Sequence, residues 1–178
     1  MKITDIRTVR VDLPSKESRT MPRRPRWAAG AEVANPMSRY AKVKRHRSLW
    51  LPRWEGAWVQ VVAEDGTWGL GTLSSAEVVT PVVEHLASQL VGEDCLATDK
   101  LADMMFRMTK PYGSTGLASY AISAIDLALW DLKGKLLEQP VYRLLGGPQK
   151  DRIYCYATGN DVDWYKELGF TAFSHQQE

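Results

Sequence analysis

The sequence predicts an α+β fold in which a three-stranded antiparallel meander is followed by a helical bundle. Three observations predict it. Apolar and polar residues alternate near the N-terminus, two further alternating stretches flank a glycine-containing turn, and apolar residues recur at helical spacing from Thr80 onward. A chain of 178 residues with 44% hydrophobic and 25% charged residues suits one or two compact units with a real core.

The strands come first. Ile3, Ile6, Val9 and Val11 predict a first strand whose alternation is imperfect. "AWVQVVAEDGTWGLGTLSS" predicts a hairpin with strands at 58–63 and 68–73 and a turn on Glu64-Asp65-Gly66. Joined in this order, the three strands form an antiparallel meander.

The helices follow. "VTPVVEHLASQLVG" predicts a helix with Pro81 in its first turn and Gly92 at its end. "ATDKLADMMFRMTK" carries one apolar stripe, which is interpreted as core: Leu101, Met104, Met105 and Met108. The third helix, near 117–137, is the longest and most apolar and ends before Pro140, so we expect it to be central and Trp130 to pack in the core.

Several titratable residues are interpreted as structural. Asp126 and Asp131 are five residues apart on the third helix, about 140° apart around its axis, so they do not form a metal pair. We expect Asp126 to be a buried acid bonded to a backbone amide or an arginine, and Asp131 to pair with Lys133, Lys135 or another segment. Cys95 and Cys155 lack nearby Cys or His ligands and are interpreted as core or half-buried thiols.

Charge is distributed unevenly along the chain. Residues 1–53 hold fourteen Lys and Arg against four Asp and Glu, whereas residues 54–178 hold nine against seventeen. The excess lies in the Arg- and Trp-rich segment Met21–Trp54, named here the basic segment, which shows no sustained helical or strand period. A solvated loop and an anion-binding loop, for small carboxylates or for nucleic acid, both remain open. No signal peptide and no run of about 18 apolar residues is seen, so a soluble cytoplasmic protein that does not contact the membrane is expected.

The stretch 121–147, "AISAIDLALWDLKGKLLEQPVYRLLGG", closely resembles the N-terminal domain of the enolase superfamily, in its mandelate racemase and muconate-lactonizing branch. "ANPMSRY" at 34–40 and "YCYATGND" at 154–161 resemble the sugar-acid dehydratases of that branch, among them those that act on rhamnonate. The resemblance extends to Phe173.

The resemblance implies a capping domain at 1–150, including the basic segment (21–54), and the start of a truncated (β/α) barrel at 151–178, with a divergent tail at 174–178. In such enzymes three carboxylates hold Mg²⁺ and a His or Lys acts as base or acid, all on barrel strands. We assign no catalytic and no metal-ligating residue to this chain and expect no cofactor in it. His175, in the divergent tail, is not interpreted as a catalytic base.

The resemblance also implies where a sugar acid is bound. By spacing from Pro36, Arg47 takes the place of a substrate-binding arginine. Arg26 and Trp27 lie where relatives place another polar residue that faces the substrate, although arginine stands here in place of the expected histidine. The predicted function is the substrate-capping part of a Mg²⁺-dependent sugar-acid dehydratase, inactive as this chain. The alternatives are a non-catalytic interaction module, through self-association or contact with a barrel-bearing chain, and a nucleic-acid-binding protein.

Overall fold

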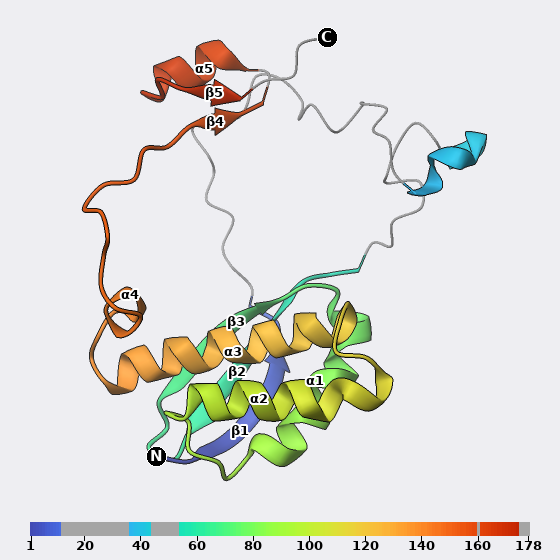
Figure 1. Ribbon diagram of the computed structural model, residues 1–178, viewed down its shortest axis with the longest axis vertical. Helices are drawn as coiled ribbons and strands as arrows, with labels where there is room; N and C mark the ends of the chain where they lie inside the picture. The colour runs from blue at the N-terminus through green and yellow to red at the C-terminus, as the bar shows by residue number, and fades with distance from the viewer. Residues whose placement is uncertain (12–35, 44–53, 160, 175–178) are drawn as a thin grey trace. The chain divides into compact units, whose positions relative to one another are not determined.

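The computed structural model describes residues 1–11, 36–43, 54–159 and 161–174. Its contacts divide the chain into two units, Met1–Leu13 with Trp54–Gln149 and Pro14–Arg53 with Lys150–Glu178. The elements of the first unit (Figure 1) are β1 Ile3–Val9, β2 Ala57–Ala63, β3 Trp68–Leu73, α1 Ala76–Leu90, α2 Thr98–Thr109, η5 Lys110–Tyr112, α3 Leu117–Leu136 and α4 Val141–Leu144. Those of the second are η2 Pro36–Arg39, η3 Ala41–Val43, β4 Ala157–Thr158, α5 Val162–Glu167 and β5 Phe173–Ser174.

The sheet of the first unit is the predicted meander. Its strand order is β1-β2-β3 and both pairs are antiparallel, which confirms the predicted α+β class. The hairpin turn has the predicted residues: Gly66 has φ +85°, and Asp65 Oδ1 accepts a hydrogen bond from Thr67 N at 2.9 Å. An Asp-Gly pair favours this turn because the aspartate bonds to the backbone two residues on and glycine tolerates positive φ.

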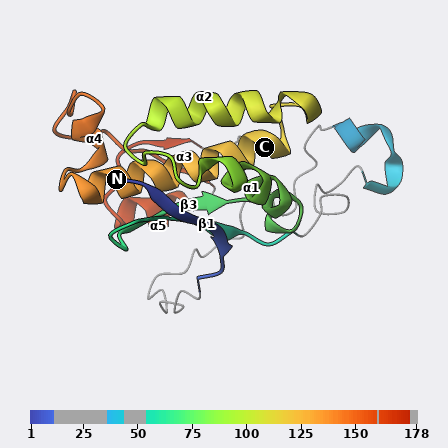
Figure 2. The same ribbon diagram turned by 90° about the horizontal axis from the view of Figure 1, so that it is seen from below.

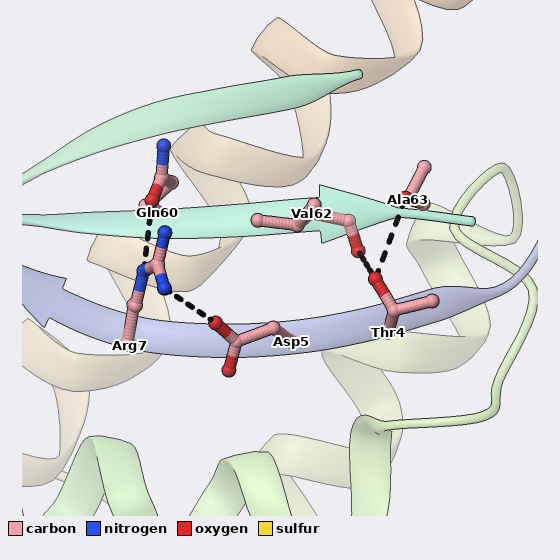
Figure 3. A network of polar contacts seen from close by, with 6 residues as sticks. All are labelled: Thr4, Asp5, Arg7, Gln60, Val62 and Ala63. Carbon is pink, nitrogen blue, oxygen red and sulfur yellow. Dashed lines mark hydrogen bonds and ion pairs between the residues drawn. The ribbon is translucent and has the colours of Figure 1, made fainter. Parts of the chain in front are cut away.

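A bulge explains the imperfect alternation of β1. Ile3 and Ile6 are both buried although they are three residues apart, because the register with β2 shifts between Ile3 and Asp5. Thr4 lies at the shift and its Oγ1 donates to Val62 O at 3.1 Å (Figure 3). Farther along, Arg7 Nε donates to Gln60 Oε1 at 2.9 Å and its guanidinium pairs with Asp5 (Figure 3). Side chains thus keep β1 and β2 joined past the bulge.

The helices α1, α2 and α3 lie on one side of the sheet (Figure 2), where α1 and α3 contact the strands and α2 packs on α1 and α3. The core lies between, and α3 is central as predicted. Its buried residues are Ala118, Ala121, Ala124, Ile125, Ala128, Leu129, Leu132 and Gly134. On α2, Leu101 and Met105 are buried and Met104 and Met108 pack against the core, which confirms that the methionine stripe is structural.

Two glycines let α3 approach β3 very closely. A Cβ on Gly71 would lie 1.9 Å from Ala124 O, and a Cβ on Gly69 would lie 2.1 Å from Ala128 O. Only a residue without a side chain fits at these two positions, because the atoms that a Cβ would meet belong to the helix backbone.

Two predictions about the helices are wrong. Pro81 lies inside α1, not in its first turn, because the helix begins at Ala76, where Glu55 O accepts a hydrogen bond from Ala76 N at 2.9 Å. Trp130 is half-buried and outside the core, and Lys133 Nζ lies 4.9 Å from the centre of its ring. One helical step, about 100°, separates Trp130 from the buried Leu129 and turns it away from the sheet.

The second unit contains a short βαβ arrangement. β4 and β5 pair in parallel, with Ala157 opposite Phe173 and Thr158 opposite Ser174, and α5 connects them in sequence. Two parallel strands cannot be joined by a tight turn, so a crossover of this kind is required. None of the helices in the described part of the chain is long and apolar enough to span a bilayer.

Candidate functional site

The predicted substrate-binding residues Arg26, Trp27 and Arg47 lie outside the described residues, and their roles stay predictions. Within the basic segment the structure describes residues 36–43 and Trp54. Residues 36–39 and 41–43 form the short 3-10 helices η2 and η3. The side chains of Arg39, Tyr40 and Lys42 are exposed and that of Val43 is buried. This part of the segment therefore presents two cations and a tyrosine to solvent.

The residues that flank the basic segment are joined to each other and to α1. Arg10 Nη1 lies 3.2 Å from Glu55 Oε2. The backbone of Glu55 is bound to the first turn of α1 on both sides, because Glu55 N donates to Glu77 Oε1 and Glu55 O accepts from Ala76 N, each at 2.9 Å. Arg10, eleven residues before the basic segment, and Glu55, directly after it, therefore meet at the N-terminus of α1. The sequence analysis did not predict this contact. The feature of the sequence that could have indicated it is Glu77, the acid in the first turn of α1.

The electrostatics of this junction follow from its hydrogen bonds. The hydrogen bond from Glu55 N lowers the pKa of the Glu77 carboxyl below 4.5, and its own backbone N–H and the nearby Arg10 guanidinium act in the same direction. A carboxylate at a helix N-terminus is also favoured by the helix dipole. Glu77 is therefore ionised at neutral pH, where it holds the chain entering β2.

The carboxyl ends of β4 and β5 bring a second group of polar atoms together. Gly159 N donates to Ser174 O at 3.0 Å just after the paired residues, and Tyr165 Oη donates to Thr158 O at 3.2 Å. Gly159 has φ +144°, and a Cβ there would lie 2.1 Å from Tyr165 Oη. Glycine at this position therefore leaves room for the Tyr165 hydroxyl at the carboxyl ends of β4 and β5.

The acids of α3 do different things. Asp131 Oδ2 accepts from Leu70 N at 2.9 Å and from Lys135 Nζ at 2.7 Å, which confirms its predicted pairing with Lys135 and with another segment. Lys135 Nζ also lies 4.2 Å from the centre of the Trp68 ring. Asp131 thereby binds a backbone N–H of the edge strand β3 and protects that edge.

Asp126 departs from its prediction. It is half-buried, but within the described residues it makes no hydrogen bond or ion pair, so the predicted bond to an amide or an arginine is wrong for this part of the chain. Burial raises the pKa of its carboxyl, and the negative charge of Asp99 raises it further.

Neither the acids nor the thiols of the described residues form a metal centre. Across residues 1–11, 36–43, 54–159 and 161–174, no group of three His, Cys, Asp or Glu side chains could hold a metal ion, so these residues do not fit Mg²⁺. Cys95 is buried as predicted, and burial raises the pKa of its thiol. Cys155 is exposed, which contradicts the prediction of a core or half-buried thiol.

Comparison with known proteins gives consistent matches. Residues 55–146 match the domain family described as mandelate racemase / muconate lactonizing enzyme, N-terminal domain. The chain is 45% identical over 140 residues to an L-rhamnonate dehydratase of Saccharopolyspora erythraea. The matched residues cover 78% of this chain and 36% of that enzyme. The chain therefore spans about a third of the length of this relative.

Solved structures agree. The chain resembles L-rhamnonate dehydratase from Gibberella zeae with 32% identity and a TM-score of 0.81, covering 98% of this chain and 42% of that one. A structure of rhamnonate dehydratase from the same organism complexed with Mg matches with 31% identity and a TM-score of 0.80, covering 98% and 44%. The 3,6-anhydro-D-galactonate cycloisomerase of Zobellia galactanivorans matches with 27% identity and a TM-score of 0.67, covering 98% and 42%.

Proposed function

The chain belongs to the mandelate racemase / muconate lactonizing enzyme N-terminal domain family, and on this basis we propose that it is the substrate-capping part of a Mg²⁺-dependent sugar-acid dehydratase for rhamnonate-like aldonates. The observation that carries the proposal is the 45% identity to an L-rhamnonate dehydratase over 140 residues. A similar domain also occurs in a 3,6-anhydro-D-galactonate cycloisomerase, so the test of the proposal uses a panel of aldonates.

The domain assignment is part of the proposal. Residues 1–150 are the capping domain with the basic segment, and residues 151–178 begin a (β/α) barrel. The parallel pair β4–β5 with α5 between its strands supports the second part, because βαβ units build such barrels. The meander and its three helices support the first. In keeping with the sequence, we propose the cytoplasm as its location.

Substrate contacts are proposed for the basic segment. The guanidinium of Arg47 would bind the carboxylate of the aldonate, because a planar fork of donors fits a carboxylate in two parallel hydrogen bonds. Arg26 and Trp27 would contact the sugar hydroxyls. The junction of Arg10, Glu55 and Glu77 supports a fixed exit of the segment, since it holds Glu55, which directly follows the segment, at the N-terminus of α1.

The proposed division of labour leaves the chemistry to the barrel. Bound Mg²⁺ stabilises the negative charge that develops when the proton next to the carboxylate is removed. The described residues hold no set of ligands for it, so we propose that this chain alone binds an aldonate without dehydrating it. Its contribution is orientation of the substrate and exclusion of water.

The experiment is a dehydration assay. The purified chain is incubated with Mg²⁺ and a panel of six-carbon and five-carbon aldonates, and 2-keto-3-deoxy acids are measured, with a metal-free control. Binding is followed by calorimetry in the wild type and in Arg47→Ala, with the exposed Arg39→Ala as matched control. We expect no product, weak aldonate binding and loss of binding in Arg47→Ala alone. Metal-dependent product from the chain alone, or binding that Arg47→Ala does not change, would contradict the proposal.

One observation favours the interaction module as a second function. The segment that leads into β4 exposes three large apolar side chains, Ile153, Tyr154 and Tyr156, the first of them 81% exposed. The faces of parallel sheets are usually covered, and large exposed apolar side chains often mark an interaction surface. These three side chains therefore favour contact with another surface. Nucleic-acid binding gains no such support. Of the basic segment's cations, the structure describes Arg39 and Lys42, and two cations do not make an extended basic surface.

A further inference from the structure

The strand β3 forms one edge of the three-stranded sheet, because the strand order is β1-β2-β3. Thr67 O accepts a hydrogen bond from Ala63 N at 2.8 Å, so the backbone groups of Thr67 and of every second residue after it point toward β2. The backbone groups of the residues between them, Trp68, Leu70 and Thr72, therefore point away from the sheet. Trp68 and Thr72 are exposed, so this edge is open to solvent. A row of such groups is a template on which another strand can pair.

Two side chains of α3 occupy this edge. Leu70 N donates to Asp131 Oδ2 at 2.9 Å, and Lys135 Nζ donates to Trp68 O at 2.9 Å. The two side chains are also joined to each other, since Lys135 Nζ donates to Asp131 Oδ2 at 2.7 Å. The centre of the Trp68 ring lies 4.2 Å from Lys135 Nζ, which holds the ammonium group from a further direction. One acceptor and one donor are thus fixed side by side at the edge of β3.

The hydrogen bonds of this pair follow the pattern of a neighbouring strand. The two bonded groups, Trp68 O and Leu70 N, lie on either side of Gly69 in the sequence. In a parallel ladder one residue of the next strand makes this combination, because its N–H donates to one carbonyl and its C=O accepts from the N–H two residues on. Asp131 and Lys135 therefore make the two hydrogen bonds that a residue of a fourth strand would make.

We propose that Asp131 and Lys135 form an edge lock, which prevents two copies of this chain from associating through β3. An open β3 edge is complementary to itself, because two identical strands related by a two-fold axis can pair antiparallel. The side chains of Asp131 and Lys135 are 39% and 42% exposed, and an ion pair this exposed contributes little to stability by itself. Its contribution is the occupation of backbone groups that would otherwise be free to bind a second copy.

The test is self-association measured by sedimentation velocity over a range of chain concentrations. The double variant Asp131→Ala, Lys135→Ala should self-associate at least about tenfold more strongly than wild type. The matched control is Asp103→Ala, Arg107→Ala, which removes an exposed ion pair of the same spacing on α2 and should sediment like wild type. Adding Thr72→Pro to the first variant should reverse its association, because proline has no N–H for a pairing strand and this N–H points away from β2.

A second measurement uses the wild type, so it does not depend on the folding of any variant. Leu70 and Thr72 both direct their N–H groups outward, and within the described residues Leu70 N is bonded to Asp131 whereas Thr72 N has no partner. The amide of Leu70 should therefore exchange with solvent at least about tenfold more slowly than that of Thr72. Equal exchange of the two amides would overturn the edge lock. So would a double variant that associates no more than wild type, or association that Thr72→Pro leaves unchanged, since unfolded chains would aggregate with or without that proline.

Discussion

Replacing Gly71 by alanine should strongly destabilise the first unit. The added Cβ would lie 1.9 Å from Ala124 O and 2.9 Å from Ala128 N, both backbone atoms of α3. Ordinary contact begins near 3.4 Å, so β3 and α3 would have to separate by about 1.5 Å. Overpacking usually costs about 1–3 kcal/mol and sometimes more. Because a whole helix must move, and with it the contacts of Ile125 and Leu129, we expect about 3 kcal/mol or more.

The assay is urea unfolding followed by circular dichroism. With a slope of about 1–3 kcal/mol per molar urea, the midpoint of Gly71→Ala should fall by about 1–3 M. Gly56→Ala is the matched control, because its Cβ would meet Leu73 O at 3.6 Å and its φ lies outside the positive range. That variant should be neutral or up to about 1 kcal/mol more stable. A loss below about 1 kcal/mol in Gly71→Ala would refute the close approach of α3 to β3.

Three further predictions concern single side chains. Leu129→Ala should cost about 2–5 kcal/mol in the same melts, and the half-buried Trp130→Ala clearly less; equal losses would place Trp130 in the core. Glu138→Gly should raise stability by about 0.5–1 kcal/mol, because Glu138 follows α3 with φ +51°, and an unchanged or lower midpoint would contradict this. Because the folded-state pKa of Glu77 lies below 4.5, its stabilisation is present above that pH and is lost as pH falls through the lowered value. Wild type should be more stable than Glu77→Gln at pH 7, and the two should be equally stable in acid. A difference in stability that persists in acid would contradict stabilisation by the ionised carboxylate of Glu77.

Local patterns predicted most of the first unit. The hairpin followed from alternation around Asp65 and Gly66, and the central place of α3 followed from its apolar spacing. What local patterns could not supply were contacts between distant segments. The start of α1 depends on Glu55, twenty-one residues upstream of Ala76, so Pro81 was placed in the wrong turn. Likewise, the close approach at Gly69 and Gly71 shows only when the helix is laid on the strand.

The site was less predictable for the same reason. Arg26, Trp27 and Arg47 were chosen by their places in the basic segment, and nothing in the local pattern of that segment fixes which of them faces a substrate. Burial of Asp126 was foreseen from its apolar neighbours, but it was not foreseen that no residue in the described ranges would bond to it. An apolar neighbourhood predicts that an acid is shielded, and only the assembled fold shows whether a donor reaches it.

The residues of α3 differ in size between the side that faces the sheet and the opposite side. Toward the sheet it presents Ala121, Ala124 and Ala128 and meets the two glycines of β3, so the backbones pack closely with little side-chain volume between them. Away from the sheet it carries Tyr120, Leu127 and Trp130, which are exposed or half-buried. A surface helix that served only this domain would gain most by placing its large apolar residues inward and charged residues outward. α3 does place Ile125, Leu129 and Leu132 inward, and it carries large apolar residues on its other side as well. Apolar side chains that stay exposed contribute little hydrophobic burial to the isolated domain, and they favour contact with another apolar surface.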